Sequence, residues 1–172
     1  MNRTENLQLR QTLASLVGLP LTCLCRVADL TMWDFGVQNL VTTKSGWKFF
    51  SDWAIHIQCA WRLLSSDAIL VASEDITRSV AGEPVSDLQA GATLLDYRLQ
   101  TLKLTGAALR VTSIESSHHT DLRIDFDRGL QLQILTLTST RDSEVEFWRL
   151  IEMSGAKRHF VAKPSGIEVH VK

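Results

Sequence analysis

Three polar side chains that could bind an anion lie at even spacing in one segment of the chain. His56, Gln58 and Arg62 lie two and four residues apart, in a segment that alternates polar and apolar residues. Residues at even spacing in a regular strand point to one face, so the sequence predicts a row of imidazole, amide and guanidinium groups. Such a row could bind an anionic ligand or a partner's carboxylate. Asp75, at the end of a later strand-like segment, is the acidic residue expected to complete this site.

The same row also has a structural interpretation. Polar residues that alternate with apolar ones are the usual pattern of a strand with one solvated face, which needs no ligand. An enzyme that uses His56, Arg62 and Asp75 as base, anion clamp and orienting group is a third hypothesis. The chain contains no phosphate-binding loop, dinucleotide fingerprint, zinc-peptidase helix or nucleophile elbow to favour it.

The cysteines have the chemistry of a metal site without its spacing. Cys23 and Cys25 share one face of a predicted strand, and a metal site would need Cys59 beside them across the sheet. However, Cys59 and His56 are an odd number of residues apart and point to opposite faces of a regular strand. The chain also has no Cys-x-x-Cys pair. We therefore predict cysteines that pack as small apolar side chains, with no metal and no cofactor.

Length, composition and charge narrow the class of protein. The 172 residues are 45% hydrophobic and 22% charged, which is typical of a globular chain, and the length predicts one domain over residues 1–172. A net charge of −1 gives no polybasic surface for nucleic acid or for a membrane. There is no signal-peptide pattern and no apolar run near the ~20 residues that cross a bilayer. With three cysteines, these features predict a cytoplasmic protein.

Two helices are predicted to pack on the strands that carry these residues. Residues 4–17 have an apolar face at helical spacing, and Gly18 follows as a stop signal. Residues 87–103 have a second apolar stripe, and Ser86 and Gln89 have the spacing of a capping box at its start.

The remaining segments have the composition and alternation of strands. The predicted strands are residues 21–27, 30–35, 52–64, 69–72, 109–114, 122–126, 130–134, 145–151, 159–162 and 167–171. Neighbouring strands joined by short turns are expected to pair antiparallel. Residues 44–52 are predicted to be a loop, whose aromatic side chains serve either the core or an exposed contact surface.

Several short pieces of the chain recur later in the chain in the same order, each set preceded by a predicted helix. The matched pieces are Gly18 with Gly106, residues 29–36 with residues 121–129, and Trp61-Arg62-Leu63 with Trp148-Arg149-Leu150. This order predicts two diverged repeats, about 4–75 and 86–163, that share one core across a pseudo-twofold axis. The predicted fold class is α+β: two helix-plus-antiparallel-strand repeats in one domain, with two main helices packed on sheet. Of the polar row, the second repeat keeps only the arginine, as Arg149.

The segment around the polar row resembles a group of bacterial domains without an assigned function. Residues 55–63 contain the pattern His-x-Gln-Cys-x-Trp-Arg, and residues 69–75 are an apolar strand that ends in Ser-x-Asp. The likeness covers about one eighth of the chain. It implies a bacterial source and an immunity-type or other partner-binding role, and it adds no catalytic residue.

The sequence predicts a non-enzymatic domain that binds a protein partner. The predicted binding surface lies around the strand of the first repeat that contains Trp61. The alternative is a small-ligand or anion-binding domain with a pocket between the repeats, near His56, Gln58, Arg62 and Asp75. An exposed aromatic patch favours the first hypothesis, whereas a pocket with convergent polar groups favours the second.

Overall fold

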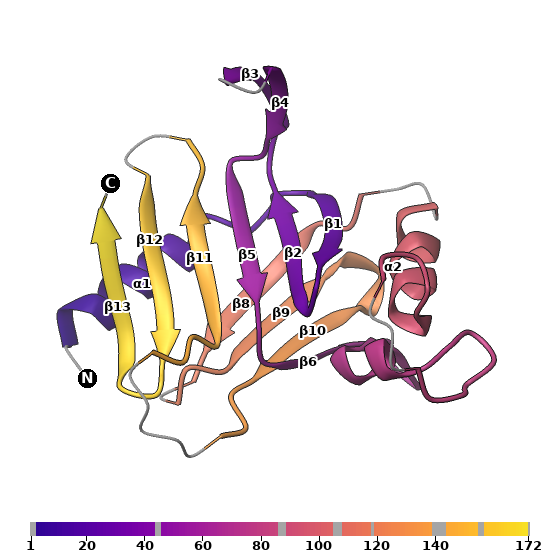
Figure 1. Cartoon of the computed structure of the whole chain (residues 1–172). Helices are drawn as coiled ribbons and strands as arrows, with labels where there is room; N and C mark the ends of the chain where they lie inside the picture. Colours follow the sequence, from indigo (N-terminus) through magenta and orange to yellow (C-terminus); the bar gives the residue numbers. More distant parts are fainter. Residues whose placement is uncertain are drawn as a thin grey trace.

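The structure, a computed structural model, is an α+β fold in which antiparallel strands predominate (Figure 1). It describes residues 3–43, 46–85, 89–104, 108–117, 119–138, 144–154 and 157–171. The predicted antiparallel pairing is confirmed for every pair of neighbouring strands in this part of the chain.

Two main sheets form the body of the molecule. In spatial order, the six-stranded sheet is β1 (Leu21–Val27), β2 (Leu30–Phe35), β5 (Trp53–Ile57), β11 (Trp148–Glu152), β12 (Arg158–Lys163) and β13 (Gly166–Val171). The five-stranded sheet is β7 (Ile69–Ala72), β6 (Ala60–Leu64), β10 (Gln131–Leu135), β9 (Leu122–Phe126) and β8 (Val111–Ser116). A separate hairpin consists of β3 (Asn39–Thr43) and β4 (Gly46–Phe50). Figure 1 shows the five-stranded sheet crossing behind the six-stranded one.

The two main sheets exchange strands. After β5 the chain leaves the six-stranded sheet and continues as β6, which pairs with β10. After β10 it returns as β11, which pairs with β5. Leaving the hairpin aside, residues 4–75 give three strands to the six-stranded sheet and two to the other, and residues 86–163 do the reverse.

The core lies between the facing sheets. Trp33 of β2 meets Trp61 of β6 edge-on, with ring centroids 5.4 Å apart. Phe35 of β2 stacks on Phe126 of β9, with centroids 6.4 Å apart. Aromatic pairs in these geometries add to the stability that burial alone gives, so they tie the two sheets together.

Each helix lies along the edges of both sheets. Helix α1 (Arg3–Ala14) contacts edge strands β8 and β13, and α2 (Leu94–Leu104) contacts edge strands β1 and β7. Their buried side chains, Leu9 and Leu13 in α1 and Leu95 and Leu99 in α2, join the central core. In Figure 1 the front of the six-stranded sheet carries no helix among the described elements. No helix in the described ranges is long and apolar enough to cross a membrane.

Helix α2 begins later than predicted. The sequence predicts a start at residue 87, whereas the helix starts at Leu94, after Thr93. Thr93 and Asp96 form a reciprocal capping pair, in which each side chain accepts a hydrogen bond from the other's backbone N–H at 3.2 Å. This Thr-x-x-Asp signal fixes the start of the helix. Ser86, the predicted cap, lies outside the described residues, as does Gly106 of the proposed repeat.

The predicted strand over residues 52–64 is wrong, because it is two strands in different sheets. The break falls at Gln58 and Cys59, between β5 and β6. Ile57 before the break and Trp61 after it are both buried in the common core. The alternation therefore continues through the break, and periodicity alone does not reveal the change of sheet.

Candidate functional site

The predicted polar row does not form one surface. His56 lies on β5 of the six-stranded sheet, and Arg62 lies on β6 of the five-stranded sheet. Both side chains alternate with core residues, so they point outward from opposite sides of the core. Gln58 is exposed in the connection between them, and its backbone N–H donates to the carbonyl of Phe147 at 2.9 Å.

His56 lies in a half-buried cluster on the outer face of the six-stranded sheet. It is directly opposite Arg149 on β11, and His159 of β12 is close enough to act on it electrostatically. Burial, followed by the charges of Arg149 and His159, lowers the pKa of His56 below its usual value of 6.5. The Arg149 guanidinium already pairs with the Glu146 carboxylate. The cluster thus combines a neutral imidazole with a neutralised arginine, which is poorly suited to capture an anion.

Arg62 belongs to a hydrogen-bonded chain on the outer face of the five-stranded sheet. Its Nε donates to Gln133 Oε1 at 2.9 Å. Gln133 donates in turn to Gln131, and Gln131 Nε2 donates to Asp125 Oδ1 at 2.7 Å. These contacts run across β6, β10 and β9 and give Arg62 a role in holding neighbouring strands together.

Asp75 is engaged in local structure at the end of β7. It lies in the short helix η1 (Ser73–Thr77), where its Oδ2 accepts the Ala72 N–H at 3.0 Å. The same oxygen is 3.6 Å from Nη1 of Arg98, which belongs to α2. Asp75 therefore ties η1 to α2. The structure does not bring His56, Gln58, Arg62 and Asp75 together into one site.

The cysteines are also dispersed. Cys23 and Cys25 lie on β1, and β2 separates that strand from β5, after which Cys59 follows. Burial raises the pKa of the Cys59 thiol to about 12, so it stays protonated at neutral pH. Within the described ranges, no three His, Cys, Asp or Glu side chains are grouped so that they could hold a metal ion.

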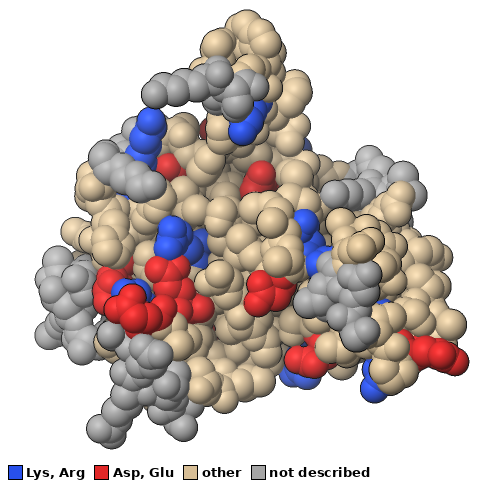
Figure 2. Space-filling model, in the orientation of Figure 1, with Lys and Arg blue, Asp and Glu red and all other residues tan. Residues whose placement is uncertain are grey.

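The β3–β4 hairpin carries the largest exposed apolar side chains of the described structure that share one face. Leu40 is directly opposite Phe49, and Thr42 is directly opposite Trp47. Residues two apart on a strand share a face, so Leu40, Trp47 and Phe49 lie together, which we call the hairpin patch. Their exposed fractions are 52%, 69% and 66%, respectively. Figure 1 shows the hairpin projecting from the body, and Figure 2 shows that its surface is mostly uncharged.

The base of the hairpin is fixed to the body. Asp52 Oδ2 accepts the Val37 N–H at 2.8 Å, and the Asp52 carbonyl accepts the Met153 N–H at 2.9 Å. Gly36 has φ +97°, and a Cβ at this position would lie 2.2 Å from Asp52 Oδ2. Only glycine therefore fits this close approach without a shift. The hairpin patch therefore projects from a base that hydrogen bonds connect to the body.

The hairpin is not required to pair the strands that flank it. β2 and β5, which it connects, pair antiparallel in the same manner as β9 and β10. β9 and β10 need only the short turn η2 (Asp127–Gly129) between them. A short turn could therefore connect β2 to β5 as well. A connection that is much longer than its strands require is typical of a functional loop.

Most of the charged side chains visible in Figure 2 lie away from the hairpin. Figure 2 shows acidic and basic groups gathered over β11, β12 and β13. Most of these charges are paired, as in Arg149 with Glu146 and Lys163 with Glu168 at 3.0 Å. This face is consequently a balanced, solvated surface and not a one-sign patch.

The sequence prediction assigned residues 44–52 to a loop and so missed the hairpin. The β-branched run Val41-Thr42-Thr43 and the alternation of Trp47 and Phe49 around Lys48 are the strand signals that could have revealed it. Comparisons of the chain with models of protein families, with curated proteins and with solved structures gave no match.

Proposed function

We propose that this protein is a non-enzymatic binding domain whose protein partner covers the hairpin patch. The observation that carries this proposal is the exposure of Leu40, Trp47 and Phe49 on one face of a projecting two-stranded sheet. An isolated two-stranded hairpin is only marginally stable in water. Exposed aromatic side chains that gather on one surface are typical of interfaces, where tryptophan is prominent among the binding hot spots.

The partner that fits this patch is a protein with an apolar groove. The patch offers aromatic and aliphatic surface without a carboxylate, and Lys48 lies on the opposite face of the hairpin. Recognition therefore depends on burying Trp47 and Phe49, with few charge pairs. We propose that the chain is a bacterial, cytoplasmic protein of the immunity type. The three cysteines form no disulfide with one another, which is compatible with the cytoplasm.

The small-ligand or anion-binding alternative at the polar row has weaker support. His56, Gln58, Arg62 and Asp75 lie at separate places, and Arg62 and Asp75 are committed to structural contacts. A catalytic role for the same residues would require them to converge on one substrate. We therefore place the binding function on the hairpin.

We also propose that the chain arose by duplication of a unit of about 80 residues, as its internal resemblance predicts. Two reciprocal pairings support this: Arg62 lies opposite Gln133, and Arg149 lies opposite His56. The strand β6, which contains Trp61, thus lies in the five-stranded sheet with β8, β9 and β10 of the second unit. The strand β11, which contains Trp148, lies in the six-stranded sheet with β1, β2 and β5 of the first unit. On this view the hairpin is an insertion specific to the first unit.

A site-specific crosslink tests the binding function. A photoreactive phenylalanine analogue replaces Phe49 in the full-length chain, and a matched variant carries it at Tyr97, which is 54% exposed on α2. We expect one protein from an extract of the source organism to crosslink at position 49 and not at position 97. Equal labelling at both positions, or none at position 49, contradicts the proposal.

Affinity then gives the quantitative test with the purified partner. The double substitution Trp47→Ser with Phe49→Ser is expected to weaken binding at least ~100-fold, since each hot-spot residue contributes about 2 kcal/mol or more. The control is Ile69→Ser with Leu137→Ser, which removes two exposed apolar side chains elsewhere. The Kd of this control for the partner should be within about twofold of that of the unaltered protein, and its melting temperature should be similar. Unchanged affinity of the hairpin variant refutes the assignment.

A further inference from the structure

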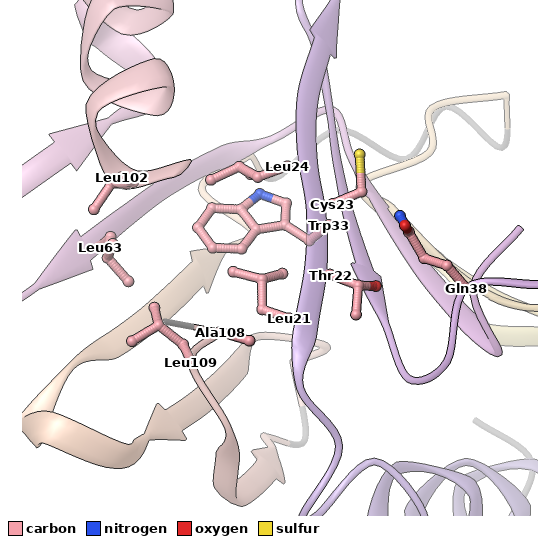
Figure 3. A pocket seen from close by; sticks show the side chains of 10 residues that line it. All are labelled: Leu21, Thr22, Cys23, Leu24, Trp33, Gln38, Leu63, Leu102, Ala108 and Leu109. Carbon is pink, nitrogen blue, oxygen red and sulfur yellow. The ribbon is translucent and has the colours of Figure 1, made fainter. Parts of the chain in front are cut away.

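An apolar cleft opens between the two sheets beside α2 (Figure 3). Its volume is about 500 Å³. Figure 3 shows leucine side chains arranged around the indole of Trp33, and these come from both sheets, from α2 and from the segment before β8. The apolar wall consists of Leu21, Leu24, Trp33, Leu63, Leu102 and Leu109.

The size of the cleft suits a small molecule. Protein interiors are close-packed, and voids larger than a water molecule are few. An apolar cavity of about 150 Å³ is enough to bind benzene, and ligand pockets commonly measure about 300–1,000 Å³. Leu102 and Leu109 are only half-buried, and Ala108 at the rim is exposed, so a ligand has a route from solvent.

The lining defines the charge of the ligand. None of the described lining residues is charged, and the polar ones are Thr22, Cys23 and Gln38. A charged ligand group would lose its hydration here without gaining a counter-charge. The cleft therefore selects an uncharged, mainly apolar molecule.

Trp33 supplies a polar anchor within this wall. Its indole Nε1 is buried and has no hydrogen-bond partner among the described residues. Trp148, also buried, donates its indole N–H to the carbonyl of Thr120 at 2.6 Å. Buried tryptophan N–H groups usually find such an acceptor, so an acceptor on the ligand is the complement that Trp33 lacks. Because the Trp33 side chain is 0% exposed, the ligand must displace a neighbouring leucine side chain to bring its acceptor to Nε1.

We propose that this cleft binds an uncharged, predominantly apolar small molecule that carries a hydrogen-bond acceptor facing Trp33. The proposal goes beyond protein binding at the hairpin patch and does not depend on it, because none of the patch residues lines the cleft.

Fluorescence titration of the full-length protein with Prodan, an uncharged naphthalene that carries one ketone, tests the proposal. We expect saturable one-to-one binding with a blue-shifted emission. Leu102→Trp, which fills the cleft, is expected to weaken binding at least tenfold. Ala108→Phe at the exposed rim is a second filling variant that carries little risk to folding. Thermal melts establish that both variants are folded.

The hairpin variant Trp47→Ser with Phe49→Ser is the control for adsorption to exposed aromatics. It should bind Prodan within twofold of the unaltered protein. Binding that does not saturate, that survives both filling variants or that disappears in the hairpin variant overturns the proposal. In nitrogen-labelled protein, the Trp33 indole N–H signal should shift most among the five tryptophans on Prodan binding. A larger shift at any other tryptophan overturns the role of Trp33.

Discussion

The substitution Asp96→Asn should destabilise the fold by removing the most buried ion pair with a described geometry. The Arg26 side chain is 3% exposed and that of Asp96 is 14% exposed. Arg26 donates from Nε to Asp96 Oδ1 at 2.9 Å and from Nη2 to Oδ2 at 2.7 Å. This two-point contact joins β1 to the first turn of α2. Asparagine keeps the shape but removes the charge, and leaves the guanidinium buried without a counter-charge.

The magnitude follows from the pKa of Asp96. Burial raises this pKa, but hydrogen bonds from Arg26 and Thr93 and the charge of Arg26 outweigh burial and lower it from 3.8 to about 2. A shift of this size corresponds to roughly 2–3 kcal/mol of stability at neutral pH. Breaking a buried pair by removing one partner costs about 3–5 kcal/mol. We therefore expect Asp96→Asn to lose about 3 kcal/mol.

Urea unfolding across a pH series measures this contribution. Because the folded-state pKa is depressed, the contribution is fully present above pH 3.8 and is lost as the pH falls towards about 2. Asp96→Asn should lack this part of the pH dependence. Glu83→Gln, at an exposed carboxylate, is the control and should stay within about 0.5 kcal/mol. A loss below about 1 kcal/mol for Asp96→Asn, or an unchanged pH slope, would show that the pair contributes little.

Three further predictions concern packing, backbone strain and the polar row. Leu95→Ala, at a side chain that is 1% exposed, should cost about 2–5 kcal/mol in urea unfolding, and a cost under about 1 kcal/mol would contradict the packing of α2. Gly36→Ala should lower stability by about 1–3 kcal/mol, and by more than Gly46→Ala, since both glycines have positive φ but a Cβ meets Asp52 only at Gly36. Equal losses in thermal melts of these two variants would show that the contact with Asp52 is unimportant. His56→Ala should change the free energy of unfolding by no more than about 1 kcal/mol. Arg62→Ala should lower it by more, because Gln133 Oε1 loses its hydrogen-bond donor. A larger loss for His56→Ala than for Arg62→Ala in denaturant unfolding would refute these assignments.

Local patterns were sufficient for the elements whose signals are local. The strand over residues 30–35 and the hairpin around the Asp127–Gly129 turn agree with the structure, because alternation and turn residues specify them directly. The first helix was placed by its apolar spacing. The start of α2 was missed although Thr93 and Asp96 give a local signal, since a second capping pattern upstream had the same spacing.

For the candidate site, the sequence alone indicated an aromatic segment that could serve as a contact surface, and the tertiary structure decided which residues are exposed. Trp33 and Trp47 have the same residue type, yet one is enclosed between the sheets and the other projects on the hairpin. Likewise, the sequence set the alternation of His56 and Arg62 with apolar neighbours, but only the tertiary structure placed them in different sheets. The reason is physical: alternation records that one side of a strand faces a core, and it is the same whichever sheet supplies the partner strand. That partner comes from residues far away in the chain.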